Sequence, residues 1–177
     1  SGKYSVYVGI DCAGVEFTGS TKEETWTNKD ITVGIKVPDN TYSFELSKRT
    51  NSGEYSLIDS YVGQVSPSYT ITDEGKTEIK VTVYDKDGNS CIAVSDAYYI
   101  DKTSPSCSVG ISGTVGENGW YKEKNATITL NRSDNLSEVT DYGLTTSSTA
   151  TYNKTASASQ GNTTGTTWYG YVKDGAG

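Results

Sequence analysis

The chain contains three cysteines, Cys12, Cys91 and Cys107, and no histidine. Histidine is the commonest general base and the commonest metal ligand, so its absence removes the usual routes to acid–base catalysis and to a zinc site. The chain also lacks a Cys-x-x-Cys pair, which argues further against zinc. Three cysteines are compatible with one disulfide and one unpaired thiol, a pattern typical of an extracellular protein.

Oxygen-bearing side chains alternate in one short segment, at Asp85, Asp87 and Asn89. Calcium takes roughly six to eight oxygen ligands, and an EF-hand loop has a glutamate at its last position, where this chain has Asp96. The same letters are typical of a hairpin turn, because Gly88 tolerates a left-handed backbone. We therefore interpret this segment as a turn, keep calcium as the weaker alternative, and predict no other metal and no cofactor.

Two pairs of adjacent acids, Glu23/Glu24 and Asp73/Glu74, are the only obvious candidates for acid–base chemistry. Glycoside hydrolysis needs two carboxylates that converge across a cleft, one of them with a raised pKa. Adjacent acids in polar turns are normally solvated instead. The chain has no Gly-x-Ser-x-Gly motif and no phosphate-binding loop. The sequence therefore predicts a protein that is not an enzyme.

Aromatic residues could form a platform that binds sugars, because the apolar faces of sugars pack on rings and rings anchor interfaces. The candidates are Tyr84, Tyr98, Tyr99, Trp120, Tyr121, Trp168, Tyr169 and Tyr171. Among them we single out Tyr98, Tyr99, Trp168 and Tyr169 as candidate binding residues. Tyr169 and Tyr171 share one face of a predicted strand, with Trp168 opposite. Packing in the core or on a sheet surface is the preferred interpretation of these rings.

The composition predicts an all-β fold. Valine and isoleucine number 24 and threonine 25, against five leucines and no methionine. Side chains branched at Cβ suit a half-buried strand and are less suited to a helix. The net charge of -7 argues against nucleic-acid partners and against a basic patch that binds membranes. No apolar run approaches the roughly 18 residues needed to cross a bilayer, so we expect no membrane insertion.

The chain repeats itself, which a length of 177 residues allows as two domains of about 90. Cys12 is followed 14 residues later by Trp26, and Cys107 is followed 13 residues later by Trp120. The segment 78–89 parallels 167–176 in the same way. The recurrence predicts a shared packing role for the two tryptophans. Pro105 in the short connection favours a boundary near residue 103, with domains at 1–102 and 103–177.

Alternating apolar residues predict the strands. Ile31, Val33 and Ile35 alternate with polar residues or glycine, and Ile79, Val81 and Val83 do the same. We expect strands near 12–18, 30–37, 41–48, 54–62, 68–72, 76–84 and 91–100 in the first domain, and near 107–112, 125–131, 139–145, 150–158 and 166–173 in the second. Short strands separated by turns indicate a β-sandwich.

The second repeat resembles bacterial immunoglobulin-like repeats. The resemblance rests on Asp101-Lys-Thr-x-Pro105, Cys107-x-Val-x-Ile-x-Gly-Thr114, Gly119-Trp-Tyr121 and Ala126-Thr-Ile-Thr-Leu130. It covers residues 101–177 well and residues 12–100 loosely. It implies two tandem immunoglobulin-like β-sandwich domains of the kind found in large surface proteins of Gram-positive bacteria. It says almost nothing about a ligand, because this fold carries many functions.

The resemblance also implies a disulfide, because the family pattern closes each module with a second cysteine after the Asp-Gly turn. Cys91 has that position in the first domain, which implies a Cys12–Cys91 bridge; Cys91–Cys107 and Cys12–Cys107 are the alternatives. Cys107 is left as the unpaired thiol, and the second domain is expected to lack its last strand. Residues 1–11 are either the closing strand of a preceding module or an extra edge strand of the first domain.

The sequence thus predicts a non-catalytic stalk or adhesive module of a cell-surface or secreted bacterial protein. Its expected partners are neighbouring modules of the same protein and a glycan or protein of a host or cell wall. One alternative is a carbohydrate-binding accessory module of a secreted glycosidase. Another is a filament or phage component assembled by strand exchange, in which an open edge in one molecule accepts a strand from another.

Overall fold

The fold is all-β, as the composition predicts. The computed structural model describes residues 9–122, 125–161 and 165–177, and these contain fourteen strands and two short 3-10 turns. The chain divides into two compact units, Ser1–Asp101 and Lys102–Gly177, called unit 1 and unit 2 below. The division lies one residue before the boundary inferred from the sequence. In the described part of the chain, no helix has the length and apolar character needed to span a membrane.

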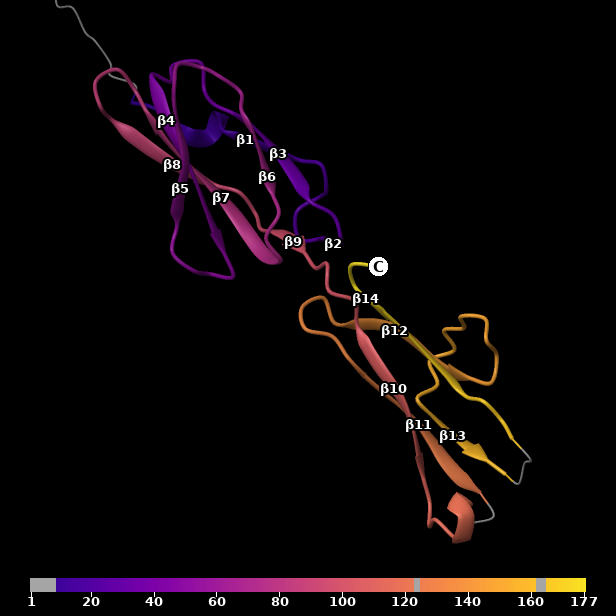
Figure 1. Ribbon diagram of the computed structural model, residues 1–177. Helices are drawn as coiled ribbons and strands as arrows, with labels where there is room; N and C mark the ends of the chain where they lie inside the picture. The colour runs from indigo at the N-terminus through magenta and orange to yellow at the C-terminus, as the bar shows by residue number, and fades with distance from the viewer. Residues whose placement is uncertain (1–8, 123–124, 162–164) are drawn as a thin grey trace, which may run out of the picture. The chain divides into compact units, whose positions relative to one another are not determined.

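Unit 1 consists of two sheets (Figure 1). The smaller has the order β1 (Glu16–Gly19), β3 (Ile31–Lys36), β6 (Ser68–Ile71). The larger has the order β2 (Trp26–Thr27), β9 (Tyr98–Ile100), β7 (Gly75–Tyr84), β4 (Ser43–Thr50), β5 (Ser56–Val62), and β8 (Ser90–Val94) also pairs with β7. All these pairs are antiparallel except β2 with β9.

The core of unit 1 lies between the two sheets and follows the predicted alternation. Every second residue of β3 and of β7 is buried. The cluster has twelve buried members: Ile31, Val33, Ile35, Val37, Phe44, Leu46, Ile71, Ile79, Val81, Val83, Tyr98 and Ile100. Each large apolar side chain contributes about 1.5–3 kcal/mol when it leaves water, so this cluster is the main source of stability in unit 1.

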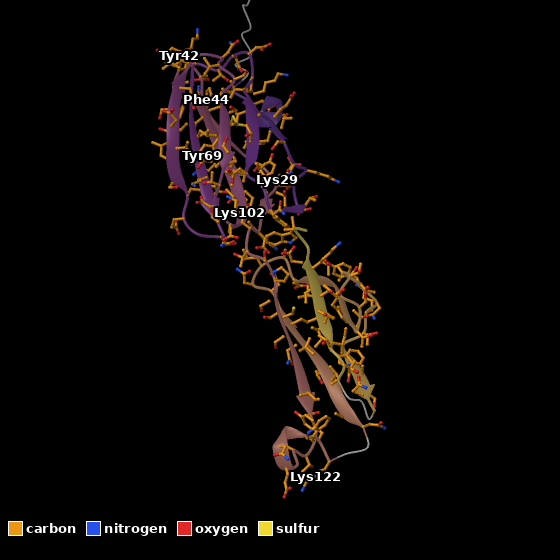
Figure 2. All side chains as sticks on the ribbon, turned by 45° about the vertical axis from the view of Figure 1, so that its right-hand side comes forward. Lys29, Tyr42, Phe44, Tyr69, Lys102 and Lys122 are labelled. Carbon is orange, nitrogen blue, oxygen red and sulfur yellow. A yellow bond between two sulfur atoms is a disulfide. The ribbon has the colours of Figure 1, made fainter. Side chains whose placement is uncertain are left out.

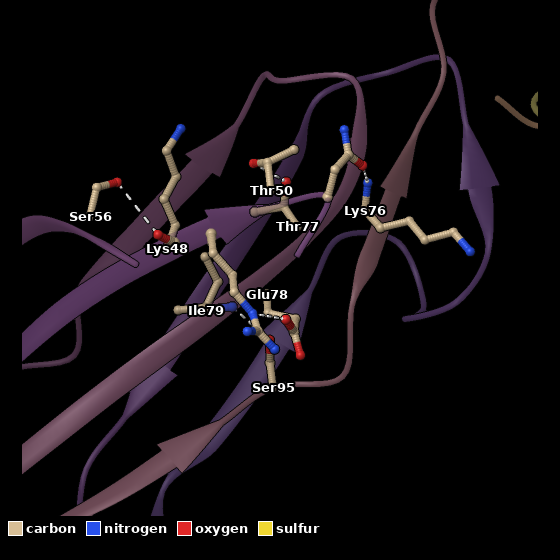
Figure 3. Close-up of polar contacts among 10 residues, drawn as sticks. Lys48, Thr50, Ser56, Lys76, Thr77, Glu78, Ile79 and Ser95 are labelled. Atoms are coloured by element: carbon tan, nitrogen blue, oxygen red, sulfur yellow. Dashed lines mark hydrogen bonds and ion pairs between the residues drawn. The ribbon is translucent and has the colours of Figure 1, made fainter. Parts of the chain in front are cut away.

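Two predicted strands of unit 1 are wrong in detail. Residues 12–18 begin as a 3-10 turn, η1 (Cys12–Gly14), because the Asp11 carboxylate accepts a hydrogen bond from the Ala13 N–H and caps the turn. The predicted strand 91–100 is two strands, β8 and β9. Between them the Ser95 hydroxyl accepts the Ile79 N–H at 3.0 Å, so a side chain replaces one backbone partner of β7 (Figure 3).

Unit 2 has the same kind of architecture with fewer strands. One sheet has the order β10 (Ser106–Ser112), β11 (Ala126–Ser133), β13 (Ser157–Gln160). The other pairs β12 (Val139–Thr145) with β14 (Tyr169–Asp174), and a second 3-10 turn, η2 (Glu117–Gly119), follows β10. The prediction of a strand at 150–158 is wrong up to residue 156, since β13 begins at Ser157.

The core of unit 2 is small. Its buried cluster has three members, Ile128, Leu130 and Leu144, and the half-buried Trp168 packs against them. Among the described residues, β14 pairs with β12 alone, whereas its sequence counterpart β7 in unit 1 has strand partners on both sides. Of the predicted edge segment 1–11, residues 1–8 lie outside the described residues, and 9–11 are not in a strand.

Candidate functional site

The cysteines pair as the family resemblance implies. Cys12 in η1 and Cys91 in β8 form a disulfide that closes a sequence separation of 79 residues. Cys91 lies opposite Val83 of β7, and both bridged cysteines pack against the core cluster. The bridge therefore joins the start of the described part of unit 1 to a strand near its end.

Cys107 is a free, exposed thiol at the start of β10. Its sulfur lies 3.6 Å from the carbonyl oxygen of Gly170 in β14. The alternative bridges from Cys107 to Cys12 or Cys91 are excluded, because those two sulfurs are bonded to each other.

The segment 85–89 is a turn stabilised by its own side chains. The Asp85 carboxylate accepts hydrogen bonds from the N–H groups of Asp87 and Asn89, at 2.9 Å each, and from the Asn89 side-chain amide. Gly88 has a φ of 82°, the left-handed conformation that favours glycine. These contacts organise the segment as a hairpin turn, the preferred interpretation from the sequence.

Tyr98 is not available to a ligand, which corrects the prediction that it is a binding residue. Its ring is fully buried in the core of unit 1, and its hydroxyl donates to Glu23 Oε1 at 3.0 Å. Burial, followed by this hydrogen bond to a carboxylate, raises the pKa of Tyr98 well above its usual value. One member of the Glu23/Glu24 pair therefore caps a core tyrosine.

Tyr99 lies on the other side of β9 and is half-buried. Its ring contacts the Trp26 ring, with centroids 5.0 Å apart, and the Lys76 ammonium lies 4.6 Å from its centroid. The Tyr99 ring therefore packs against other side chains of unit 1. The other predicted acidic pair is similarly engaged in part, because Asp73 forms an ion pair with Lys48.

Trp168 and Tyr169 lie in unit 2 on opposite sides of the chain. Trp168 packs against the core, and its indole N–H donates to Gln160 Oε1 at 2.9 Å. Tyr169 stacks against Tyr171 at 6.5 Å, which agrees with their predicted shared face. Of the four candidate binding residues, Tyr98 and Tyr99 belong to unit 1, and Trp168 and Tyr169 belong to unit 2.

The two recurring tryptophans differ, which corrects the expectation of a shared packing role. Trp26 is half-buried against Tyr99, whereas Trp120 is 64% exposed. Trp26 also pairs with β9 through its backbone. In the described part of unit 2 no strand corresponds to β9, so Trp120 has no equivalent surface to cover.

A cleft at one end of unit 1 gathers polar residues that the sequence analysis did not select. The register places Ser43 opposite both Val62 and Tyr84, so the loops at 37–42, 63–67 and 85–89 meet at the same end of the sheets. The cleft has a volume of about 390 Å³, and its lining includes Asp39, Asn40, Thr41, Tyr42, Gln64, Asp85, Lys86 and Asp87. We call it the loop cleft.

Tyr42 is the aromatic member of the loop cleft and is 59% exposed. Figure 2 shows it at one end of unit 1, toward the opposite end from Lys29. The neighbouring Thr41 is buried, and its Oγ1 has no hydrogen-bond partner among the described residues. Local sequence patterns give no signal for this site, because its three loops adjoin only once β4, β5 and β7 pair in register.

Two carboxylates in unit 2 come close enough to be considered for a metal. Oxygens of Asp134 and Asp174 lie within 4.8 Å of each other. However, Asp134 Oδ2 accepts the N–H groups of Leu136 and Glu138, and Asp174 Oδ1 accepts those of Ala176 and Gly177. These carboxylates organise turns, while Asp134 Oδ1 is buried and has no hydrogen-bond partner among the described residues.

Comparison with protein-family models, curated proteins and solved structures finds no match for the chain.

Proposed function

We propose that the chain is a non-catalytic spacer segment of an extracellular or cell-surface protein, built from two tandem immunoglobulin-like β-sandwich domains. The observation that carries the proposal is the Cys12–Cys91 disulfide. Disulfides persist in oxidising compartments, which supports a secreted or surface location. The resemblance of residues 101–177 to surface-protein repeats of Gram-positive bacteria supports the same reading.

The position of the bridge suits a segment that bears tension. A pulling force applied at the ends of unit 1 acts on the covalent link between Cys12 and Cys91 before it acts on most of the core. The strands that hold the core, from β3 to β7, lie between these two residues in the sequence. The bridge therefore protects most of unit 1 from extension, whether or not the hydrogen bonds between the strands of unit 1 open.

Single-molecule pulling tests the proposal directly. With the disulfide intact, the 79-residue separation between Cys12 and Cys91 stays closed, and only the residues outside it extend. Reduction should add an extension of roughly 280 Å, at about 3.6 Å per residue. A Cys107→Ser variant is the matched control, because it removes the free thiol and leaves the bridge. Full extension of unit 1 without reductant would contradict a load-bearing role.

Assembly by strand exchange is a second candidate, favoured by the edges of unit 2. Among the described residues, β10 pairs only with β11 and β14 only with β12. Exposed strand edges can accept a strand from another chain. Light scattering over a range of protein concentrations tests this candidate. It predicts oligomers that disappear when residues 1–10 are deleted, whereas a chain that stays monomeric at all concentrations rejects it.

A further inference from the structure

The loop cleft of unit 1 combines an exposed ring with side chains that have no use within the fold. Among the described residues, the side chains of Asp39, Asn40, Gln64 and Asp87 make no hydrogen bond or ion pair. All four are exposed, and they come from three different loops. A protein surface has many free polar groups, but these converge on one concave site beside Tyr42.

The chemistry of the lining matches a ligand rich in hydroxyl groups. The amides of Asn40 and Gln64 can both donate and accept hydrogen bonds, and the carboxylates of Asp39 and Asp87 accept strong ones. A hydroxyl likewise donates and accepts. The Tyr42 ring offers the flat apolar surface on which the CH face of a sugar packs. The cleft volume of about 390 Å³ lies within the range of small-ligand sites.

Charge narrows the choice of ligand further. The lining contains three carboxylates, Asp39, Asp85 and Asp87, against one lysine, Lys86. This balance disfavours phosphate groups and acidic sugars, because like charges repel in a partly desolvated site. A bare divalent cation is also disfavoured, since the Asp85 carboxylate already accepts three hydrogen bonds from its own turn.

We propose that the loop cleft binds an oligosaccharide without acidic groups, with Tyr42 as the stacking surface and Asn40, Gln64 and Asp87 as the hydroxyl-recognising side chains. The proposal does not rest on the spacer function: the ligand site lies in loops, and the load-bearing bridge lies between η1 and β8.

The test uses the full chain, fluorescently labelled at Cys107, on an array of neutral, amino-bearing, sialylated and sulfated glycans. We expect binding to neutral or amino-bearing glycans and none to acidic ones. A soluble form of the best glycan is then titrated calorimetrically. Tyr42→Ala should weaken its affinity at least about fivefold, since ring stacking and central aromatic contacts dominate such sites. Asn40→Ala should weaken it as well.

Trp120→Ala is the matched control, because Trp120 is a ring in unit 2 that is 64% exposed, close to the 59% of Tyr42. It should leave the affinity unchanged, and thermal unfolding should show all three variants folded. An array on which no glycan binds would overturn the proposal, as would binding that survives Tyr42→Ala. Heat from titration with calcium chloride that disappears in Asp87→Asn would overturn it in favour of a cation site. None of these outcomes would alter the pulling result for the spacer.

Discussion

Replacing Cys91 with serine removes the one bridge of unit 1 and should cost a large part of its stability. The bridge closes a separation of 79 residues. In the chain-entropy relation, a closed loop of this length lowers the entropy of the unfolded chain enough to add about 4.5 kcal/mol to the free energy of unfolding. Observed values for native disulfides of small domains are about 2–5 kcal/mol, so we expect a loss of this size.

Urea unfolding followed by tryptophan fluorescence measures the loss in unit 1 separately from unit 2. Unit 1 contains Trp26 alone, so Trp120→Phe and Trp168→Phe leave a chain whose indole signal reports only unit 1. Trp26 packs against Tyr99, so its emission changes when β2 and β9 separate. A loss of about 2–5 kcal/mol divided by a urea slope of about 1–3 kcal/mol/M should lower the midpoint by roughly 0.7–5 M. The slope should rise, because an unbridged unfolded chain exposes more surface.

Cys107→Ser is the control, since it removes an exposed thiol that takes no part in the bridge. It should leave the midpoint of unit 1 unchanged. A shift smaller than about 0.5 M in Cys91→Ser would refute the entropic reasoning. An equal loss in Cys107→Ser would refute the assignment of the effect to this bridge.

Four further outcomes follow from single residues. In Gly19→Ala the new Cβ would lie 2.6 Å from the Thr21 carbonyl oxygen and closer still to the Tyr98 ring, so urea unfolding should show a loss of about 1–3 kcal/mol. The pKa of Tyr98 is raised in the folded state, so above about pH 10 the unfolded chain loses this phenol proton while the folded chain keeps it. The free energy of unfolding, followed by circular dichroism against pH, should therefore fall above about pH 10. Leu144→Ala, in a cluster of only three buried residues, should lower the stability of unit 2 by about 2–5 kcal/mol in urea and leave unit 1 unchanged. Cys107 should react with a maleimide under native conditions at one equivalent per chain, as mass spectrometry would show.

Local patterns predicted the strands that one buried face defines. Ile79, Val81 and Val83 alternate along the chain, and a strand places all three on one buried face. A shift of the strand register by one residue would expose all three. The same reasoning failed at Ser95, whose polar side chain looks like any outward strand position in the sequence. Its contact with the Ile79 N–H, 16 residues away, interrupts the strand, and no local pattern encodes that distance.

The candidate sites likewise divide into those formed by local contacts, which were predictable, and those formed by long-range contacts, which were not. The turn at 85–89 was predictable because its contacts lie within five residues. The burial of Tyr98 was not predictable, because it depends on the pairing of β9 with β7 and on a glutamate 75 residues away. The loop cleft was missed for the same reason: its lining comes from three loops that adjoin only once β4, β5 and β7 are in register.

The amino-acid sequence by itself determined the all-β fold class, most strand positions and the turn chemistry, because these depend on side-chain shape and on neighbours a few residues apart. Only the tertiary structure decided which rings are buried and which are exposed. Trp26 and Trp120 occupy equivalent places after Cys12 and Cys107, yet only Trp26 has Tyr99 to cover. Exposure depends on which distant strands pack nearby, and that information is spread over the whole chain rather than held in any one motif.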